Sequence, residues 1–242
     1  MKVKAIISYD GSKFMGFQKQ KTTQNTIATQ IELALKSLNI NSKIKGSGRT
    51  DRGVHSTGQI IDFTLPPFWQ KKSLNELKNR LNSKLKYIQF EKIEIVDDCF
   101  DAQFSAKVRV YRYVIKTTPT SVFEKDFITY QKIDDFNLFK KAINLFKGEH
   151  NFKYFKKEGS ITSSDIREIY KTKLFKLKDY IFVYFYANGY LRSQVRLMIA
   201  TAIATANNKI TLKELQNQIN AKEKYITKSA PPNGLYLYKV IY

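Results

Sequence analysis

Strand-like and helix-like apolar patterns alternate along this chain, and their order constrains the fold more than any single residue does. Residues 1–9 alternate apolar and polar side chains, as a half-buried strand does. Apolar residues then recur at helical spacing from Ile27 to Leu38, directly after Thr26, whose hydroxyl can cap a helix. This order predicts an α+β fold with antiparallel-rich sheets that carry helices on one face.

The alternation continues to the end of the chain. Further strands are expected at residues 42–45, 59–65, 87–96, 107–116, 166–177, 180–188 and 234–241. Helices are expected after Ser73, after Asp134 or Asp135, along the apolar stripe from Leu191 to Ala206, and after Thr211. Ser73 and Thr211 each precede a Glu by three residues, the capping-box pattern, and Gly148 can end the third helix. The weakest join lies at residues 99–105, so two α+β units are expected, at 1–104 and 105–242.

Positive charge dominates the composition, because 42 Lys and Arg against 21 Asp and Glu give a net charge of +21. The basic residues are spread along the chain, so the positive field belongs to the folded body, and a polyanionic partner would relieve its self-repulsion. No basic amphipathic helix or lipidation signal points to a membrane surface. The charge therefore predicts a nucleic acid partner.

Several other classes of protein are disfavoured. No stretch is long and apolar enough for a membrane span, and residues 1–9 lack the apolar region of a signal peptide, so we expect a cytoplasmic protein. The single cysteine, Cys99, excludes an intramolecular disulfide framework. A structural zinc site usually needs four Cys or His ligands, and only His55 and His150 accompany Cys99. We therefore expect no metal.

Residues 46–58 form a glycine-rich segment with unusual chemistry. Its glycines permit tight turns and close approach to a ligand, and two arginines, Arg49 and Arg52, flank one carboxylate, Asp51. In an extended stretch Arg49 and Asp51 point to the same side, where the guanidinium would keep the carboxylate ionised. Such an Asp suits nucleophilic catalysis. Asp followed closely by Gly is also typical of an ordinary turn, and the residues alone leave both interpretations open.

The strand expected at residues 107–116 has two different faces. Arg109, Tyr111 and Tyr113 share one face, whereas valines occupy the other. The valine face predicts core, and the Arg and Tyr face suits a surface that clamps phosphates and stacks a base. A half-buried strand with ordinary tyrosines is the alternative.

Arginine is scarce and unevenly placed. The eight arginines are Arg49, Arg52, Arg80, Arg109, Arg112, Arg167, Arg192 and Arg196, and the other 34 (42 − 8) basic residues are lysines. Arginine offers a planar fork that lysine lacks, so its positions mark candidate phosphate or carboxylate contacts, although chance codon usage is an alternative. Arg192 and Arg196 stand four apart at the start of an expected helix and would share a face, which suits anion binding or simple solvation.

Together these segments resemble the tRNA pseudouridine synthase A family in order along nearly the whole chain. The most specific match is Gly-Arg-Thr-Asp-Arg-Gly-Val-His at residues 48–55, which is similar to the family signature Gly-Arg-Thr-Asp-Ala-Gly-Val-His. The other matching segments are residues 9–18, 100–106, 111–113, 148–152, 188–196 and 230–235.

The resemblance implies a role for each matching residue. Asp51 would be the nucleophile, Arg49 its ion-pair partner and Tyr111 the aromatic residue against the target base, while Arg196 would complete the site from the second half. The residues expected to contact substrate, besides Tyr111, are Arg52, Arg109, Arg112, Arg192 and His55.

The resemblance also implies a fold and a reaction. The family fold has two ferredoxin-like halves that form a central sheet and a basic cleft, and it works as a homodimer. It isomerises uridine to pseudouridine at positions 38, 39 and 40 of the tRNA anticodon stem-loop, without metal or cofactor. An isomerisation needs no second substrate, only a carboxylate, a pocket for a flipped base and a group that helps to remove the C5 proton.

Four positions depart from the family pattern. Arg52 replaces Ala, Gln103 replaces Arg, Gln194 stands where Met is common, and Ala200 stands where Gly is frequent. None removes a catalytic group, but Arg52 could add a phosphate contact and Gln103 lose one.

Two other functions remain as alternatives. A catalytically silent tRNA-binding or tRNA-chaperone protein could use the same scaffold, although it would not need the intact catalytic set. A hydrolase built on Asp51 with Asp97, Asp98 or Asp101 would need those carboxylates in one site, and no sequence feature places them there.

Overall fold

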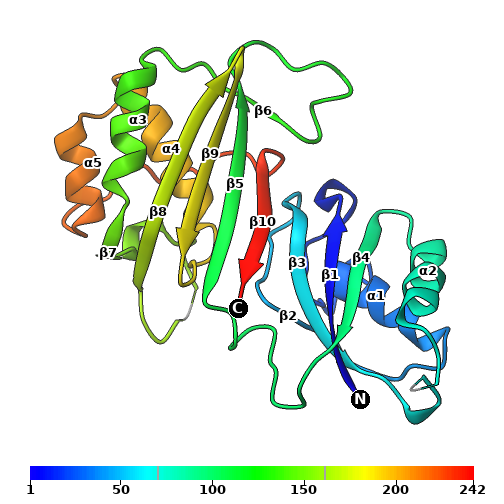
Figure 1. The fold of residues 1–242 in the computed structure, drawn as a ribbon. Coiled ribbons are helices and arrows are strands. Elements are labelled where there is room, and N and C mark those ends of the chain that lie inside the picture. Colours follow the sequence, from blue (N-terminus) through cyan, green and yellow to red (C-terminus); the bar gives the residue numbers. More distant parts are fainter. Residues whose placement is uncertain (70, 161) are drawn as a thin grey trace. The chain divides into compact units, whose positions relative to one another are not determined.

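The computed structural model describes residues 1–69, 71–160 and 162–242. Two compact units divide the chain: Met1–Lys107 with Tyr236–Tyr242 form the first unit, and Val108–Leu235 form the second. Each unit combines a sheet with helices (Figure 1), which confirms the α+β class. The boundary falls after residue 107, where residue 104 was expected, and the C-terminal strand lies in the first unit.

The described residues of the first unit form five strands and two α-helices. They are β1 (Lys2–Tyr9), α1 (Ile27–Lys36), β2 (Lys45–Gly46), β3 (His55–Thr64), α2 (Leu74–Lys84), β4 (Ile88–Ile95) and β10 (Leu235–Ile241). β1 pairs antiparallel with both β3 and β4, and the short β2 also pairs antiparallel with β3. β10 pairs parallel with β3, where Tyr236 faces His55 and Leu237 faces Ser56.

The core of the first unit lies between its sheet and its helices. Val3, Ala5 and Ile7 of β1 are fully buried, and they belong to one cluster with Ile31 of α1 and Leu81 of α2. Burial of one such aliphatic side chain contributes about 1.5–3 kcal/mol, so the alternation of β1 is a major source of stability. Thr26 caps α1 as expected, since its hydroxyl accepts a hydrogen bond from the backbone N–H of residue 29.

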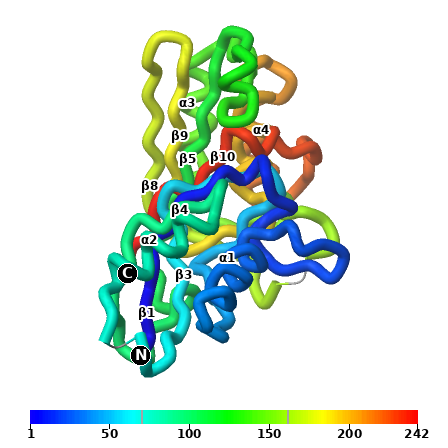
Figure 2. Tube along the Cα trace, turned by 90° about the vertical axis from the view of Figure 1, so that its right-hand side faces the viewer, coloured from blue at the N-terminus to red at the C-terminus, as the bar shows by residue number. Residues whose placement is uncertain are grey.

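The second unit has an antiparallel sheet with helices on one face. Its elements are β5 (Val108–Lys116), β6 (Thr129–Tyr130), α3 (Phe136–Leu145), β7 (Gly148–Asn151), β8 (Ile166–Leu177), β9 (Tyr180–Ala187), α4 (Gln194–Ala206) and α5 (Leu212–Ile219). β5, β9, β8 and β7 pair antiparallel in that order, and β6 adds in parallel to β5. Figure 2 shows β8 and β9 as one long hairpin, as the sequence predicts.

Alternation along β9 separates the two faces of this sheet. Ile181, Val183 and Phe185 are fully buried, and Phe185 packs against Phe146 at the end of α3, with ring centroids 6.3 Å apart. The side chains between them, from Tyr180 to Tyr186, are only partly buried. The helices therefore cover one face of β9, and the other face is open.

Several expected boundaries are wrong, and tertiary contacts explain the differences. Only β2 forms where residues 42–45 predicted a strand, because the Ser42 hydroxyl and the Glu32 carboxylate accept the backbone hydrogen bonds of residues 64 and 44. β3 begins at His55 instead of residue 59, since β10 pairs with its first residues. α4 begins at Gln194 because Ser193 has a left-handed backbone, with φ of 61°.

The helix caps are closer to expectation. Thr211 and Glu214 form the expected capping box, and Asp135 caps α3 through its carboxylate. Ser73 caps α2, but Glu76 forms an ion pair with Arg80. Gly148 has φ of +112° and lies at the start of β7, two residues beyond the C-cap of α3.

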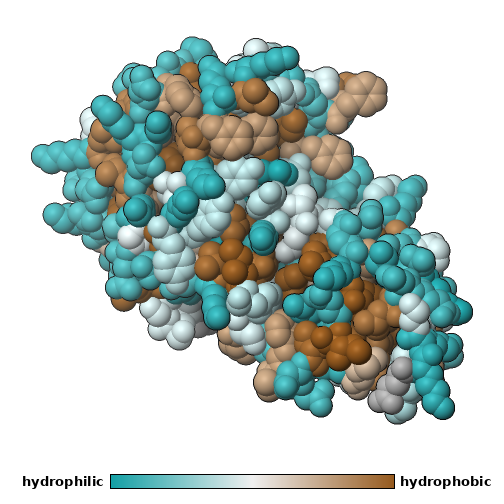
Figure 3. All heavy atoms as spheres, in the orientation of Figure 1, coloured by the Kyte–Doolittle hydropathy of each residue, from teal (hydrophilic) through white to brown (hydrophobic). Residues whose placement is uncertain are grey.

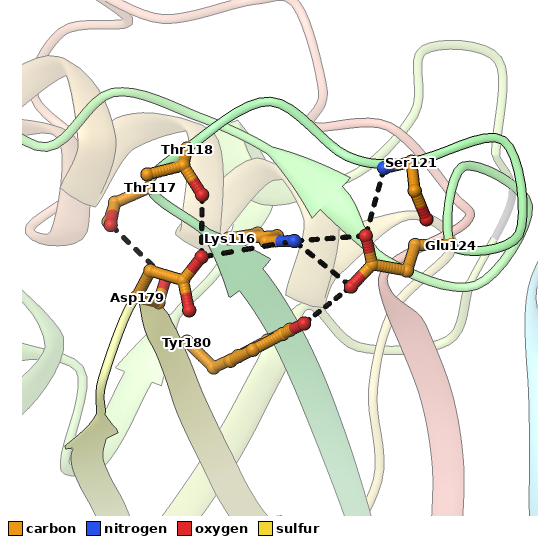
Figure 4. Close-up of polar contacts among 7 residues, drawn as sticks. All are labelled: Lys116, Thr117, Thr118, Ser121, Glu124, Asp179 and Tyr180. Atoms are coloured by element: carbon orange, nitrogen blue, oxygen red, sulfur yellow. Dashed lines mark hydrogen bonds and ion pairs between the residues drawn. The ribbon is translucent and has the colours of Figure 1, made fainter.

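A polar network fixes the chain between β5 and β6 (Figure 4). The Glu124 carboxylate accepts hydrogen bonds from the Lys116 ammonium at 2.9 and 3.1 Å, from the Ser121 backbone N–H at 2.8 Å and from the Tyr180 hydroxyl. These contacts lower the pKa of Glu124 to about 2, with the Tyr180 hydroxyl as the largest cause. The network joins the ends of β5 and β9 to the turn that leads into β6.

Replacement of Glu124 by Gln should destabilise the protein in a pH-dependent way. A depressed carboxyl pKa stabilises the fold above the ordinary value of 4.5, and this contribution is lost as pH falls toward about 2. The difference in urea midpoint between wild type and Glu124→Gln should therefore be largest near neutral pH and should shrink below about pH 4.5. Glu149→Gln, in β7 and outside this network, is the matched control. A difference that stays constant into acid would contradict this account.

Candidate active site

The candidate catalytic carboxylate, Asp51, is half-buried on a segment whose neighbours are anchored. Thr50 before it and Val54 after it are buried, whereas Arg49 and Arg52 are exposed. The ion pair predicted between Arg49 and Asp51 stays a prediction. The backbone around Asp51 is thus held while both flanking guanidinium groups reach solvent.

Contacts on the N-terminal side of Asp51 fix Thr50. Its hydroxyl lies 2.8 Å from the Tyr9 hydroxyl, and its carbonyl accepts a hydrogen bond from the Phe17 backbone N–H at 3.1 Å. The backbone of Gly16, which has φ of +109°, passes close to the Thr50 carbonyl group. A Cβ at this position would lie 3.2 Å from the Thr50 carbonyl oxygen. The opening segment of the chain therefore forms one wall of the Asp51 loop.

Two buried side chains hold the start of the same loop. The Ser47 hydroxyl donates to the Gln59 side-chain carbonyl at 2.5 Å, and the Gln59 amide donates to the Gly48 carbonyl at 2.8 Å. Both side chains are almost fully buried, so these hydrogen bonds satisfy groups that water cannot reach. β3 thereby positions the residues that precede Arg49.

Contacts on the C-terminal side of Asp51 involve Gly11. Its carbonyl accepts a hydrogen bond from the Gly53 N–H at 3.2 Å, and the Val54 N–H donates to the Asp51 carbonyl at 3.1 Å. A Cβ on Gly11 would lie 1.9 Å from the Val54 carbonyl oxygen, so only glycine fits. These hydrogen bonds fix a turn at residues 51–54. Asp51 can thus lie in a turn and still be available as a catalytic carboxylate, so the two interpretations of this segment do not exclude each other.

His55 follows this turn and is buried, with 1% of its surface exposed. Its Nδ1 accepts a hydrogen bond from the Gly11 N–H at 3.1 Å, and its ring stacks on Tyr236 at a centroid distance of 4.9 Å. The buried ring of His55 therefore contacts residues of the protein itself, Gly11 and Tyr236. The substrate contact predicted for His55 stays a prediction.

In the second unit, Tyr111 of β5 is only 8% exposed. Its ring meets the ring of Tyr190 edge to face, with centroids 5.0 Å apart and planes at 82°. Tyr190 donates its hydroxyl to the Arg109 carbonyl at 3.3 Å, and the Arg109 guanidinium donates to the Asn188 carbonyl at 2.8 Å. These contacts join the start of β5 to residues 188–190.

Tyr113, further along the same face of β5, is an internal tyrosine, which is the alternative that the sequence left open for this face. Tyr113 is fully buried, and its hydroxyl donates to the Pro231 carbonyl at 2.8 Å and lies 3.0 Å from the Thr129 hydroxyl. Burial raises the pKa of Tyr113, which keeps this hydroxyl protonated. Because Val110 and Val114 are buried as well, both faces of β5 lie mainly in the interior.

Arg196 lies in α4 and is tied to the segment before β10. Its Nε donates to the Ala230 carbonyl at 2.7 Å, and the Ala230 N–H donates to the Arg196 carbonyl at 3.0 Å. Arg192 is exposed and lies before α4, so the expected helical face shared by Arg192 and Arg196 does not form. The left-handed Ser193 between them is the physical reason.

The structure thus gathers Arg49, Asp51, Arg52 and His55 on one segment of the first unit, and Arg109, Tyr111 and Tyr190 in one cluster of the second. Arg112, next to Tyr111 on β5, points to the opposite face. Sequence reasoning gave no role to the residues that anchor the Asp51 loop, namely Tyr9, Gly11, Gly16 and Gln59. Three of these, Tyr9, Gly11 and Gly16, lie in the Tyr-Asp-Gly opening segment, whose family match was the available signal.

Within residues 1–69, 71–160 and 162–242, no group of three or more His, Cys, Asp or Glu side chains is placed to hold a metal ion. Across the same ranges, none of the helices has the length and apolar character needed to cross a membrane.

Comparison with known proteins identifies relatives along the whole chain. A family model described as tRNA pseudouridine synthase matches residues 5–105 and 142–242. The tRNA pseudouridine synthase A of Helicobacter hepaticus is 42% identical over 244 residues, covering 99% of this chain and 98% of that protein. The tRNA pseudouridine synthase A of Wolinella succinogenes is 38% identical over 237 residues, covering 98% and 92%.

Among solved structures, one titled "Crystal Structure of a Cbf5-Nop10-Gar1 Complex" aligns with 81% of this chain and 44% of that chain, at a TM-score of 0.35 and 9% identity. So distant a likeness supports no argument about this protein. The sequence matches are much stronger evidence, because they cover at least 98% of this chain at 38% and 42% identity. By family model and by relatives alike, the chain belongs to the tRNA pseudouridine synthase A family.

Proposed function

We propose that this protein converts uridine to pseudouridine in the anticodon stem-loop of tRNA, with Asp51 as the nucleophile. The observation that carries the proposal is the anchoring of the Asp51 backbone from both sides, by Thr50 contacts before it and by Gly11 after it. A carboxylate held in a fixed backbone, half-exposed between two solvent-facing arginines, is suited to attack a bound polyanion.

The reaction conserves every atom of the nucleotide. The N1–C1′ bond breaks, the base turns, a C5–C1′ bond forms, and the proton lost from C5 is balanced by a proton gained at N1. Asp51 supplies the covalent intermediate that holds the substrate while the base turns, so no second substrate enters. The target base must first leave its stack, which a stem-loop permits at lower cost than a long duplex.

The remaining predicted residues fit positioning and binding roles. Arg49 and Arg52 are exposed beside Asp51 and can contact phosphates. Tyr111 offers a ring whose orientation is fixed edge to face by Tyr190, as a base-stacking side chain requires. Arg196 is oriented by its hydrogen bond to the Ala230 carbonyl. The net charge of +21 suits an RNA substrate, and because tRNA is a cytoplasmic molecule we place the activity in the cytoplasm.

The protein is further proposed to act as a homodimer through the open face of the β8–β9 hairpin. Phe175 is 48% exposed and Leu177 60% exposed on β8. The Phe175 ring stacks on Phe182 at 5.0 Å and on Tyr184 at 6.1 Å. Figure 3, in the orientation of Figure 1, shows apolar side chains gathered among hydrophilic ones in the region of β8 and β9.

A second copy is the occupant that suits this surface. Its rings already stack on one another, so they form a flat apolar area of the kind that packs face to face on another sheet. A two-fold axis would bring the same rings of both copies together.

Asp51→Asn should abolish pseudouridine formation while tRNA affinity and thermal midpoint stay near wild type. The substitution keeps size and polarity but removes the nucleophile, which acts in the transition state. Base-resolution mapping of unmodified tRNAs, in EDTA and without nucleotides, measures the product. Asp98→Asn is the matched control and should stay active. If the wild-type protein forms no pseudouridine in a full set of tRNAs, the alternative of a catalytically silent tRNA-binding protein is favoured. If Asp51→Asn turns over within about tenfold of the wild-type rate, covalent catalysis by Asp51 is excluded.

Tyr111→Phe separates the ring of this residue from its hydroxyl. If the hydroxyl takes part in proton removal, the Phe variant should bind tRNA normally and lose on the order of a hundredfold in single-turnover rate. Tyr111→Ala should also weaken binding, by about 1–3 kcal/mol. Tyr113→Phe, two residues along the same face, controls for loss of a buried hydroxyl and should affect stability more than rate. An unchanged rate for Tyr111→Phe would remove the hydroxyl from the mechanism.

Phe175→Glu should convert the proposed dimer to a monomer of 28.2 kDa, as measured by light scattering. A buried carboxylate on each side of a two-fold interface lacks a partner, which strongly disfavours association. Phe123→Glu is the control, because Phe123 is 87% exposed but lies between β5 and β6. Monomeric wild type, or a Phe175→Glu variant that remains dimeric, would refute this interface.

A further inference from the structure

His55 is a buried imidazole that the proposed chemistry does not use. It begins β3, four residues after Asp51, and its side chain is buried. A histidine that contacts neither solvent nor a metal is often only a satisfied core residue. The contacts of His55, however, lead to the backbone of the candidate nucleophile.

The first contact fixes the protonation of the ring. Nδ1 accepts a hydrogen bond from the Gly11 N–H at 3.1 Å, so Nδ1 carries no proton and the proton of the neutral ring lies on Nε2. The Asp10 carboxylate lies 3.4 Å from the same Nδ1, but it already accepts from the Ser12 N–H at 3.0 Å and the Ser12 hydroxyl at 2.7 Å. The Gly11 N–H is therefore the group that His55 holds.

Gly11 passes this constraint to the Asp51 turn. While its N–H donates to His55, its carbonyl accepts from the Gly53 N–H at 3.2 Å, and the Val54 N–H closes the turn on the Asp51 carbonyl at 3.1 Å. The contact is tight, because a Cβ on Gly11 would lie 1.9 Å from the Val54 carbonyl oxygen. Without the Nδ1 acceptor, the Gly11 backbone would no longer be held in place, and the hydrogen bond between its carbonyl and the Gly53 N–H would weaken.

The ring has a second, separable role. It stacks on Tyr236 of β10 with centroids 4.9 Å apart and planes at 24°, so it also packs the C-terminal strand against β3. A phenylalanine can keep this packing without an acceptor. An asparagine can place its Oδ1 close to the position of Nδ1 without the ring.

We propose that His55 is a positioning residue for Asp51, and that its Nδ1, acting through Gly11, sets the backbone turn that aims the carboxylate. The proposal rests on the proposed catalytic role of Asp51. It predicts that catalytic rate depends on the acceptor and that stability depends on the ring. A merely structural histidine would make the two quantities change together.

The experiment compares His55→Phe, which keeps a ring, with His55→Asn, which keeps an acceptor. His55→Phe should lose tenfold to about a hundredfold in single-turnover rate on one tRNA, since small misplacement of a reacting group is costly, while tRNA affinity stays within about twofold. His55→Asn should keep its rate within about fivefold of wild type despite a lower thermal midpoint. An Asn variant as slow as the Phe variant, or a Phe variant as fast as wild type, would overturn the proposal.

Amide hydrogen exchange supplies a readout that does not depend on activity. In His55→Phe the amides of Gly11 and Gly53 should exchange faster than in wild type, and in His55→Asn they should stay protected. If wild type makes no pseudouridine but this pattern appears, the proposed function fails and the positioning contact stands. If both amides stay protected in His55→Phe, the positioning role fails whatever the activity is.

Discussion

The close approach of Gly11 to Val54 is the constraint on which the rest of the candidate site depends. A backbone that passes within van der Waals contact of another backbone leaves no room for a side chain, so glycine is required at this point. The approach lets one short segment donate to His55 and accept from Gly53 at the same time. These hydrogen bonds hold the glycine-rich segment in one defined turn, although its glycines would allow many backbone conformations.

Local chemistry in the sequence was enough to predict most elements of the fold. Thr26, Asp135 and Thr211 cap helices as their side chains predict, and the β8–β9 hairpin follows from its apolar pattern. Long-range pairing was not available from local patterns. The early start of β3 at His55 depends on β10, which lies about 180 residues later in the chain.

The same limit applies to the candidate site. The signature around Asp51 identifies the carboxylate, because its residue types and spacing are specific, but it does not reveal that Tyr9, Gly11 and Gln59 hold the loop. Likewise, the strand pattern left open whether Tyr113 faces a binding surface or the interior, and its hydroxyl is satisfied internally by Thr129 and Pro231. Side-chain alternation gives the faces of a strand, and only the packed neighbours decide which face is covered.

The place of β10 in the first unit has a consequence for biosynthesis. Ribosomes make residues 1–107 well before the strand that borders His55 and Ser56, which follows about 180 residues later. A nascent chain therefore cannot stack Tyr236 on His55 until residue 236 has emerged. Until then the histidine beside the Asp51 turn lacks this ring partner, so the first unit is completed only after the residues of the second unit have been made.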